Sequence, residues 1–266
     1  MPQECKVRSR ALLLAIVAVV GLRVAPAAAQ ATDDGPRRVG VPAPPPSDFM
    51  LGRPRVYLGV DSGFLFANTG SDLYDFITEQ LTLDKKSFNT PVLGARLGVS
   101  LNPRIDVIGG FDLARSQSGS EYRNLVDNQL LPISQNTSRR EFNLTGSVRL
   151  NVLPSGRRIS RFAWIPRTFT PYVGAGAGAL KYQFEQTGSF VDFETLRVFN
   201  DTFVSEGWAP SAHAFAGADL RVYRRIYLSL EGRYTWSTAR LGTDFVDFDP
   251  ISLAGVRLGG GLRIAF

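Results

Sequence analysis

The last twelve residues, Gly255-Val256-Arg257-Leu258-Gly259-Gly260-Gly261-Leu262-Arg263-Ile264-Ala265-Phe266, decide the fold class. Successive side chains on a β-strand point to opposite faces, so a period of two marks a strand. One face of this stretch carries Val256, Leu258, Leu262, Ile264 and Phe266, and the other carries Arg257, Gly259, Gly261 and Arg263. The pattern predicts a strand that is apolar on one side and charged or glycine-rich on the other.

The same alternation recurs along the chain. Eight segments show it, at about 56–66, 91–101, 105–117, 141–153, 169–184, 209–223, 226–237 and 251–266. The connections alternate between short links, at 102–104 and around 224–225, and long ones, at 67–90, 118–140, 185–208 and 238–250; the link at 154–168 is intermediate. Short and long connections on opposite ends of a sheet are typical of an up-and-down barrel. The sequence therefore predicts an all-β fold, an eight-stranded antiparallel up-and-down transmembrane β-barrel.

The register of one hairpin follows from the same pattern. Leu101 and Ile105 both fall on the apolar face, and joining them leaves a three-residue turn. Directly opposite residues of an antiparallel pair share a face. This pairing sets Gly94 against Asp112 and places Arg96 diagonal to Asp112.

The polar phase is charged, whereas the apolar phase is almost free of charge. Arginines and carboxylates separated by glycines suit a narrow barrel interior, and an uncharged face suits lipid. We expect a charge network that fills the lumen, made of Arg96, Asp106, Asp112, Arg149, Asp219, Arg221, Glu231, Arg233, Arg257 and Arg263. The glycines leave open a second possibility, a narrow thread of water past them.

Aromatic residues gather near the strand ends. We expect a girdle at the long-loop end from Phe64, Phe66, Phe142, Tyr182, Phe184, Trp208, Tyr234 and Trp236, and a second at the short-turn end from Phe169 and Phe266. Two such girdles flanking an apolar band are typical of transmembrane barrels.

The N-terminus predicts export. Residues 1–29 have a basic start, an apolar run at Ala11–Leu22 and small residues at 27–29, as a secretory signal peptide has. Its removal takes the only cysteine, Cys5, together with four basic residues and one acidic residue, and so lowers the formal charge from +6 to +3. A disulfide framework and nucleic-acid binding are therefore not expected. We expect residues 30–54 to form a Pro-rich periplasmic linker, either a disordered tether or a contact segment, and the barrel to occupy 55–266.

Catalytic and metal sites are weakly signalled. The single histidine, His213, lies two positions from Ser211 on the same strand face, a poor spacing for a nucleophile and its base. Three aspartates in the last long link, Asp244, Asp247 and Asp249, do not have the spacing of a calcium loop. We assign no catalytic residue, no cofactor and no metal.

The long links carry apolar and basic residues. Leu73, Tyr74, Phe76, Ile77, Phe190, Val191, Phe193, Phe245 and Phe248 either form an exposed interaction surface or pack against one another. Lys85, Lys86, Arg139 and Arg140 are candidates for contact with lipopolysaccharide phosphates.

Three motifs resemble a known family. The final strand ending on Phe266, the segment Thr170–Gly178 and the hairpin from Gly217 to Tyr234 resemble small outer-membrane barrels of the OmpA/OmpX/OmpW type. The resemblance implies location in a bacterial outer membrane and recognition of Phe266 by the barrel-assembly machinery. It also implies a structural or surface-interaction role. We expect no enzyme activity, because His213 and Ser211 are poorly spaced, and an outer-membrane enzyme is the third and least favoured hypothesis. A narrow channel, or an OmpW-like route for apolar molecules, is the alternative.

Overall fold

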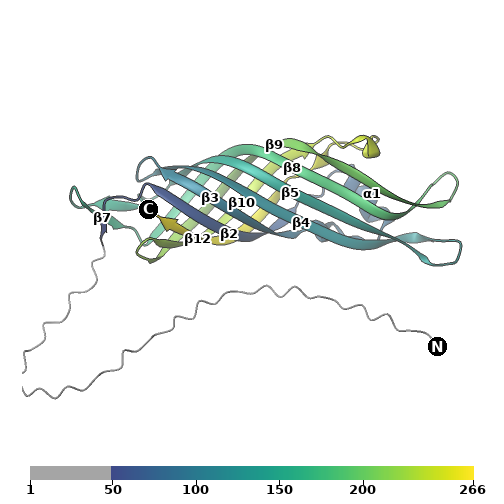
Figure 1. Ribbon diagram of the computed structural model, residues 1–266, viewed down its shortest axis with the longest axis horizontal. Helices are drawn as coiled ribbons and strands as arrows, with labels where there is room; N and C mark the ends of the chain where they lie inside the picture. The colour runs from purple at the N-terminus through teal and green to yellow at the C-terminus, as the bar shows by residue number, and fades with distance from the viewer. Residues whose placement is uncertain (1–48) are drawn as a thin grey trace, which may run out of the picture. The chain divides into compact units, whose positions relative to one another are not determined.

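A closed β-sheet forms the body of the molecule (Figure 1). The computed structural model describes residues 49–266, so the predicted signal peptide and most of the predicted linker lie outside the described residues. Eight strands follow one another around the ring: β2 (Val56–Ala67), β3 (Thr90–Ser100), β4 (Ile105–Val126), β5 (Pro132–Asn151), β8 (Phe169–Val191), β9 (Val198–Tyr223), β10 (Ile226–Ala239) and β12 (Gly255–Ala265). Each pairs antiparallel with the next, and β12 pairs with β2. The predicted eight-stranded up-and-down barrel is confirmed.

The seam between the first and last barrel strands is closed by the end of the chain. The Phe266 amide donates to the Val56 carbonyl at 2.7 Å, and its own carbonyl accepts from Arg55 at 2.8 Å. Gly63 and Gly259 face each other across this seam. A Cβ on Gly63 would lie 2.5 Å from the Leu258 carbonyl oxygen, so the close approach of β2 and β12 requires glycine there.

The predicted register of the β3–β4 hairpin is confirmed. Gly94 pairs with Asp112, and the Leu101 amide donates to the Ile105 carbonyl at 3.0 Å. The Asn102 side chain accepts the amides of Arg104 and Ile105 at 2.8 and 2.9 Å, a local bond that fixes the turn.

The prediction that 118–140 and 185–208 are long loops is wrong. Most of 118–140 and 185–208 continues the ladders of β4 with β5 and of β8 with β9, leaving turns only at 127–131 and 192–197. The outward faces of these extensions are mostly polar, with Arg140 and Glu185 among their residues, so they lack the apolar outer face that marks the membrane-facing part of each strand. The result is two long hairpins that project beyond the rest of the ring (Figure 1).

Short elements occupy both ends of the barrel. The long-loop end holds α1 (Asp72–Gln80), η1 (Lys85–Phe88), η2 (Thr243–Phe245) and β11 (Ile251–Ser252), so the predicted segment 251–266 is two strands. The short-turn end carries a separate three-stranded sheet of β1 (Met50–Leu51), β7 (Ala163–Pro166) and β6 (Gly156–Arg158). Between residues 49 and 266, no helix has the length and apolar character needed to cross a bilayer.

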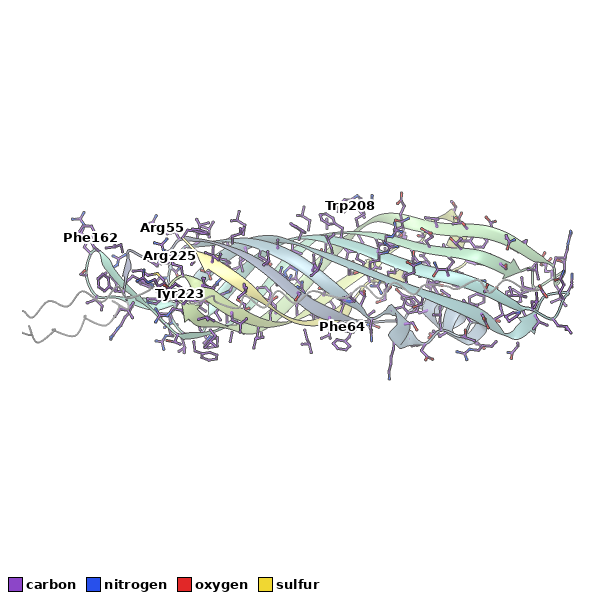
Figure 2. All side chains as sticks on the ribbon, turned by 60° about the horizontal axis from the view of Figure 1, so that its bottom comes forward. Arg55, Phe64, Phe162, Trp208, Tyr223 and Arg225 are labelled. Atoms are coloured by element: carbon purple, nitrogen blue, oxygen red, sulfur yellow. The ribbon has the colours of Figure 1, made fainter. Side chains whose placement is uncertain are left out.

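An apolar band surrounds the barrel. Leu58, Leu93, Leu144, Leu230 and Leu258 all point outward and are 52–63% exposed. Figure 2 shows Phe64 and Trp208 partway along the barrel, with Arg55, Tyr223 and Arg225 toward the short-turn end. A continuous apolar outer face of this kind requires an apolar solvent, which a bilayer supplies.

The predicted long-loop girdle is only partly right. Phe64, Phe66, Trp208 and Trp236 are exposed on the outer face, but Tyr182 and Phe184 are 2% and 0% exposed. Both lie at even positions of β8, the same phase as the interior glycines, so they point into the barrel.

Candidate functional site: a charged barrel interior

The middle of the barrel is filled by six charged side chains, which we call the central cluster: Asp61, Arg96, Asp112, Glu231, Arg233 and Arg257. Arg96 contacts both Asp61 and Asp112 at 3.1 Å. Arg257 donates to the same two carboxylates from the opposite wall. Arg233 lies 2.9 Å from Glu231 and 3.6 Å from Asp112. These contacts join four strands, β2, β3, β4 and β12, to β10.

A second group, the turn-side cluster, lies toward the short-turn end and consists of Asp106, Arg149, Asp219 and Arg263. Arg149 bonds to Asp219 and lies 3.3 Å from Asp106. Arg263 reaches Asp219 at 2.6 Å from the other side. Asp219 also accepts a hydrogen bond from Ser229 at 2.5 Å, so three donors surround one fully buried carboxylate.

Both clusters are electrically balanced. The central cluster has three arginines and three carboxylates, and the turn-side cluster has two of each. An unpaired buried charge costs several kcal/mol, whereas a hydrogen-bonded pair offsets much of that cost. Balance within each cluster is therefore what allows so many charges to occupy a narrow interior.

Tyrosine rings connect the two clusters. The Arg149 guanidinium lies 3.9 Å from the Tyr172 ring centroid, and the Tyr172 hydroxyl donates to Glu231 at 3.2 Å. Arg263 lies over Tyr57 at 4.5 Å and over Tyr227 at 4.9 Å. Such cation–π contacts stabilise cations that water cannot reach.

The structure brings nine of the ten residues of the expected network into these two clusters. The tenth, Arg221, is half-buried one interior position beyond Asp219 on β9. The expected network omitted Asp61, which joins Arg96 to Arg257, and the three tyrosines. Their position in the polar phase was the available signal, because Asp61 and Tyr57 alternate with outward residues of β2 exactly as Gly59 does.

The long-loop end is closed by a hydrophobic cluster that we call the loop core. It contains Leu73, Tyr74, Ile77, Leu81, Leu83, Phe88, Leu180, Tyr182, Phe184, Ala209, Ala239, Phe245, Ile251 and Leu253. Loop residues thus pack against one another and against β8, which decides between the two interpretations of their apolar character. Phe76 and Phe193 remain exposed, with their rings 6.4 Å apart.

Arg139 belongs to this buried region. It is 3% exposed and bonds to Glu141 and, at 3.0 Å, to the Tyr74 hydroxyl. Burial raises the pKa of Tyr74, so the hydroxyl stays protonated beside the arginine. Arg139 is therefore not available to an external phosphate, in contrast to the expectation for it.

The spaces between these layers are small. A cavity of about 60 Å³ lies between the two clusters, lined by Arg96, Arg149, Arg233 and the glycines at 59, 259 and 261. Another of about 40 Å³ separates the central cluster from Leu180 and Leu253 of the loop core. A cavity needs at least about 10–15 Å³ to accommodate one water molecule, so both are large enough for water but too small for a solute.

His213 does not pair with Ser211. Its Nε2 lies 2.7 Å from Ser147 Oγ, whereas Ser211 donates to Asn143 at 3.0 Å. His213 is 1% exposed and stacks on Phe215 at 6.0 Å. Across residues 49–266, no group of three or more His, Cys, Asp or Glu side chains is placed to hold a metal ion.

Comparisons with known proteins give structural matches at low identity. No protein-family model matches the sequence, and no curated protein matches it. The chain is similar to the Neisserial surface protein A, NspA, with 11% identity over 79% of this chain and 97% of that chain and a TM-score of 0.47. It is similar to Ail, the attachment invasion locus protein of Yersinia pestis (13%, 79% and 99%, TM-score 0.43). It is also similar to the outer membrane protein OprG from Pseudomonas aeruginosa (10%, 82% and 99%, TM-score 0.44).

Proposed function

We propose that this chain is an integral β-barrel of a bacterial outer membrane with a closed lumen, and that it acts through its long-loop end. The observation that carries the proposal is the filling of the interior at three levels: the turn-side cluster, the central cluster and the loop core. Side chains just fill the interior of an eight-stranded barrel, and here the balanced ion pairs do so. The apolar outer band supports insertion in a membrane.

The projecting hairpins supply the surface for contact outside the cell. Each turn is held by an aspartate: Asp127 accepts the Gln129 and Leu131 amides at 2.8 Å, and Asp192 accepts the Glu194 amide at 2.9 Å. Each turn also displays a leucine with positive φ, Leu130 at 63° and Leu196 at 56°, which are 81% and 66% exposed. The backbone of each leucine closes its turn, since the Leu130 and Leu196 amides donate to the Asp127 and Asp192 carbonyls at 3.0 and 2.7 Å. The exposed leucine side chains make no such contribution, which supports a role in binding.

The positions of exposed basic residues and of Phe266 support the proposed lipid and assembly partners. Lys85, Lys86 and Arg140 are exposed on the long-loop side and suit lipopolysaccharide phosphates. Phe266, at the exposed end of the last strand, suits recognition by the barrel-assembly machinery. The proposal assigns no catalytic residue, since His213 is enclosed in the barrel with Ser147.

Conductance across a planar bilayer tests the closed lumen. We expect the refolded full chain to be silent, that is, to produce no conductance. Its folding is checked by its faster migration on an unboiled gel. Replacing residues 72–88 by a Gly-Ser linker should leave it silent, because the central cluster still fills the lumen. Adding Asp61→Ser with Arg257→Ser and Arg149→Ser with Asp219→Ser to that variant should produce discrete steps, because all three barriers are then weakened.

Discrete steps from the unaltered chain would refute the closed lumen and favour the alternative, a narrow channel. Silence from the variant altered at all three levels, when it is folded, would show that these layers are not what closes the lumen.

A further inference from the structure

The two ends of the barrel carry opposite charge. The short-turn end is formed by segments 49–55, 101–104, 152–168 and 221–225, which together hold ten arginines and neither Asp nor Glu. The long-loop segments 68–89, 115–140, 181–208 and 240–250 hold 14 acidic and nine basic residues. The interior clusters are neutral, so this asymmetry belongs to the two exposed ends.

Backbone hydrogen bonds gather the arginine-bearing segments at one place. The Ser155 amide donates to the Pro103 carbonyl at 2.9 Å, and the Asn151 amide donates to Arg104 at 2.7 Å. The Arg53 guanidinium donates to the Ser100 and Leu101 carbonyls at 3.0 Å. Segments that lie far apart in the sequence are therefore held together, and Figure 2 shows Arg55 and Arg225 at this same end of the barrel.

A groove of about 540 Å³ opens between these segments, and three of its lining residues are Arg53, Arg104 and Arg158, beside Trp164. This volume is within the range of ~300–1,000 Å³ that small-molecule sites occupy. Burial lowers the pKa of Arg53, the nearby charges of Arg55 and Arg158 lower it further, and the Asp106 carboxylate partly opposes them. The groove thus concentrates like charges that an anion would neutralise.

The groove adjoins the apolar band. Leu101, Val152 and Leu153 are 61%, 51% and 37% exposed and belong to the same turns as its arginines. Exposed aromatic residues, Phe162 and Tyr223 among them, accompany the arginines at this end (Figure 2). Arginine guanidinium groups can donate two hydrogen bonds to one phosphate. Such groups next to apolar surface match a ligand with a phosphate headgroup and acyl chains.

We propose that the groove lined by Arg53, Arg104 and Arg158 binds the headgroup of an anionic phospholipid in the membrane leaflet at the short-turn end. The inference rests on the membrane insertion proposed above, but not on the closed lumen. A zwitterionic lipid offers the same phosphate with no net charge, so the proposal requires preference for an anionic lipid. The acidic long-loop end offers no comparable attraction, which makes the binding one-sided.

Native mass spectrometry of the full chain refolded in detergent tests the site, with phosphatidylglycerol and phosphatidylcholine as probes. We expect tighter retention of phosphatidylglycerol. The triple substitution Arg53→Ser, Arg104→Ser and Arg158→Ser should weaken it on the order of a hundredfold, since each basic residue near an anionic surface contributes roughly a factor of five. The matched control, Arg140→Ser with Arg197→Ser and Arg240→Ser, removes the same charge at the other end and should leave retention within about twofold.

A second variant guards against misfolding. Arg104→Glu with Arg158→Glu keeps the backbone contacts of Arg53 and should abolish the preference, while Arg104→Lys with Arg158→Lys should keep most of it. Equal loss in the control, equal retention of both lipids, or displacement of phosphatidylglycerol by millimolar inorganic phosphate would each overturn the proposal. A chain that does not fold in detergent would instead overturn membrane insertion, so the two failures are distinguishable.

Discussion

Replacing Asp219 by alanine should lower the free energy of unfolding of the barrel more than other changes of similar size. Its side chain is fully buried and accepts hydrogen bonds from Arg149, Arg263 and Ser229. Asp219→Ala leaves the turn-side cluster with two arginines and one carboxylate, Asp106. Removing one partner of a buried pair costs about 3–5 kcal/mol, because the remaining charge is desolvated and unpaired. Arg149 keeps Asp106 at 3.3 Å, which places our expectation toward the lower part of that range.

The free energy of unfolding in urea, measured for the barrel in lipid vesicles, is the readout. Asp75→Ala is the matched control, since Asp75 pairs with Lys85 at 2.6 Å while both side chains are more than half exposed. An exposed pair contributes about 0–1 kcal/mol. The same chemical change should therefore cost several times more at Asp219 than at Asp75.

A double variant separates charge imbalance from lost packing. Asp219→Ala with Arg263→Met restores equal numbers of arginines and carboxylates in the turn-side cluster. Residues in one ion-pair network couple by about 0.5–3 kcal/mol. The double variant should therefore lose less free energy of unfolding than the two single variants lose together. If Asp219→Ala costs no more than Asp75→Ala, or if the two changes are additive, the network does not stabilise the barrel as described.

Two further changes test the outer face and the interior glycines. Leu230→Arg, at a position 62% exposed in the apolar band, should cost about 2–4 kcal/mol in vesicles, whereas Val246→Arg, 78% exposed in a loop, should cost little; equal urea midpoints would argue against a lipid-facing band. Gly176→Ala should cost about 1–3 kcal/mol, because its Cβ would lie 2.7 Å from both His213 Nε2 and Ser147 Oγ. Gly146→Ala, with nothing within 4 Å of its Cβ, should be neutral, and comparable losses at the two glycines would contradict the assigned faces.

The alternation of side chains was enough to predict the barrel where one strand face meets lipid. Gly94 opposite Asp112 follows from the apolar phase of Leu101 and Ile105, because a slip by one residue would turn Asp106 and Asp112 outward. The same rule fails beyond the membrane, where the outward faces of β4, β5, β8 and β9 are mostly polar. There each strand is held by backbone hydrogen bonds to its partner, β4 to β5 and β8 to β9, and the local sequence shows no period of two that would predict it.

The interior was predictable as a set of residues but not as a set of pairs. The phase of each strand identified Arg149, Asp219 and Arg263 as interior, whereas their mutual contacts depend on the stagger of eight strands around a closed ring. Tyr182 shows the opposite error. Its aromatic character suggested the girdle, although its even position on β8 placed it with the interior glycines.

The basic groove could not be predicted from any single segment of the sequence. No single segment has a basic patch that stands out after the signal peptide is removed, and the low charge of +3 argued against one. Arg53, Arg104 and Arg158 come from three separate segments, which meet only because β1 pairs with β7 and the short turns gather at one end. A patch assembled by topology has no signature in local composition.

The distribution of charge also limits how the barrel enters a membrane. Eight of the ten arginines at the short-turn end are exposed: Arg55, Arg104, Arg157, Arg158, Arg161, Arg167, Arg224 and Arg225. Moving each through the bilayer midplane costs about 2–4 kcal/mol, and no acidic residue in those segments offsets the cost. The long-loop end also carries charges, but its acidic and basic residues are interspersed, so transient pairing can reduce their cost. The end that crosses should therefore be the long-loop end, and the arginine-rich end should stay on the side from which the chain inserts.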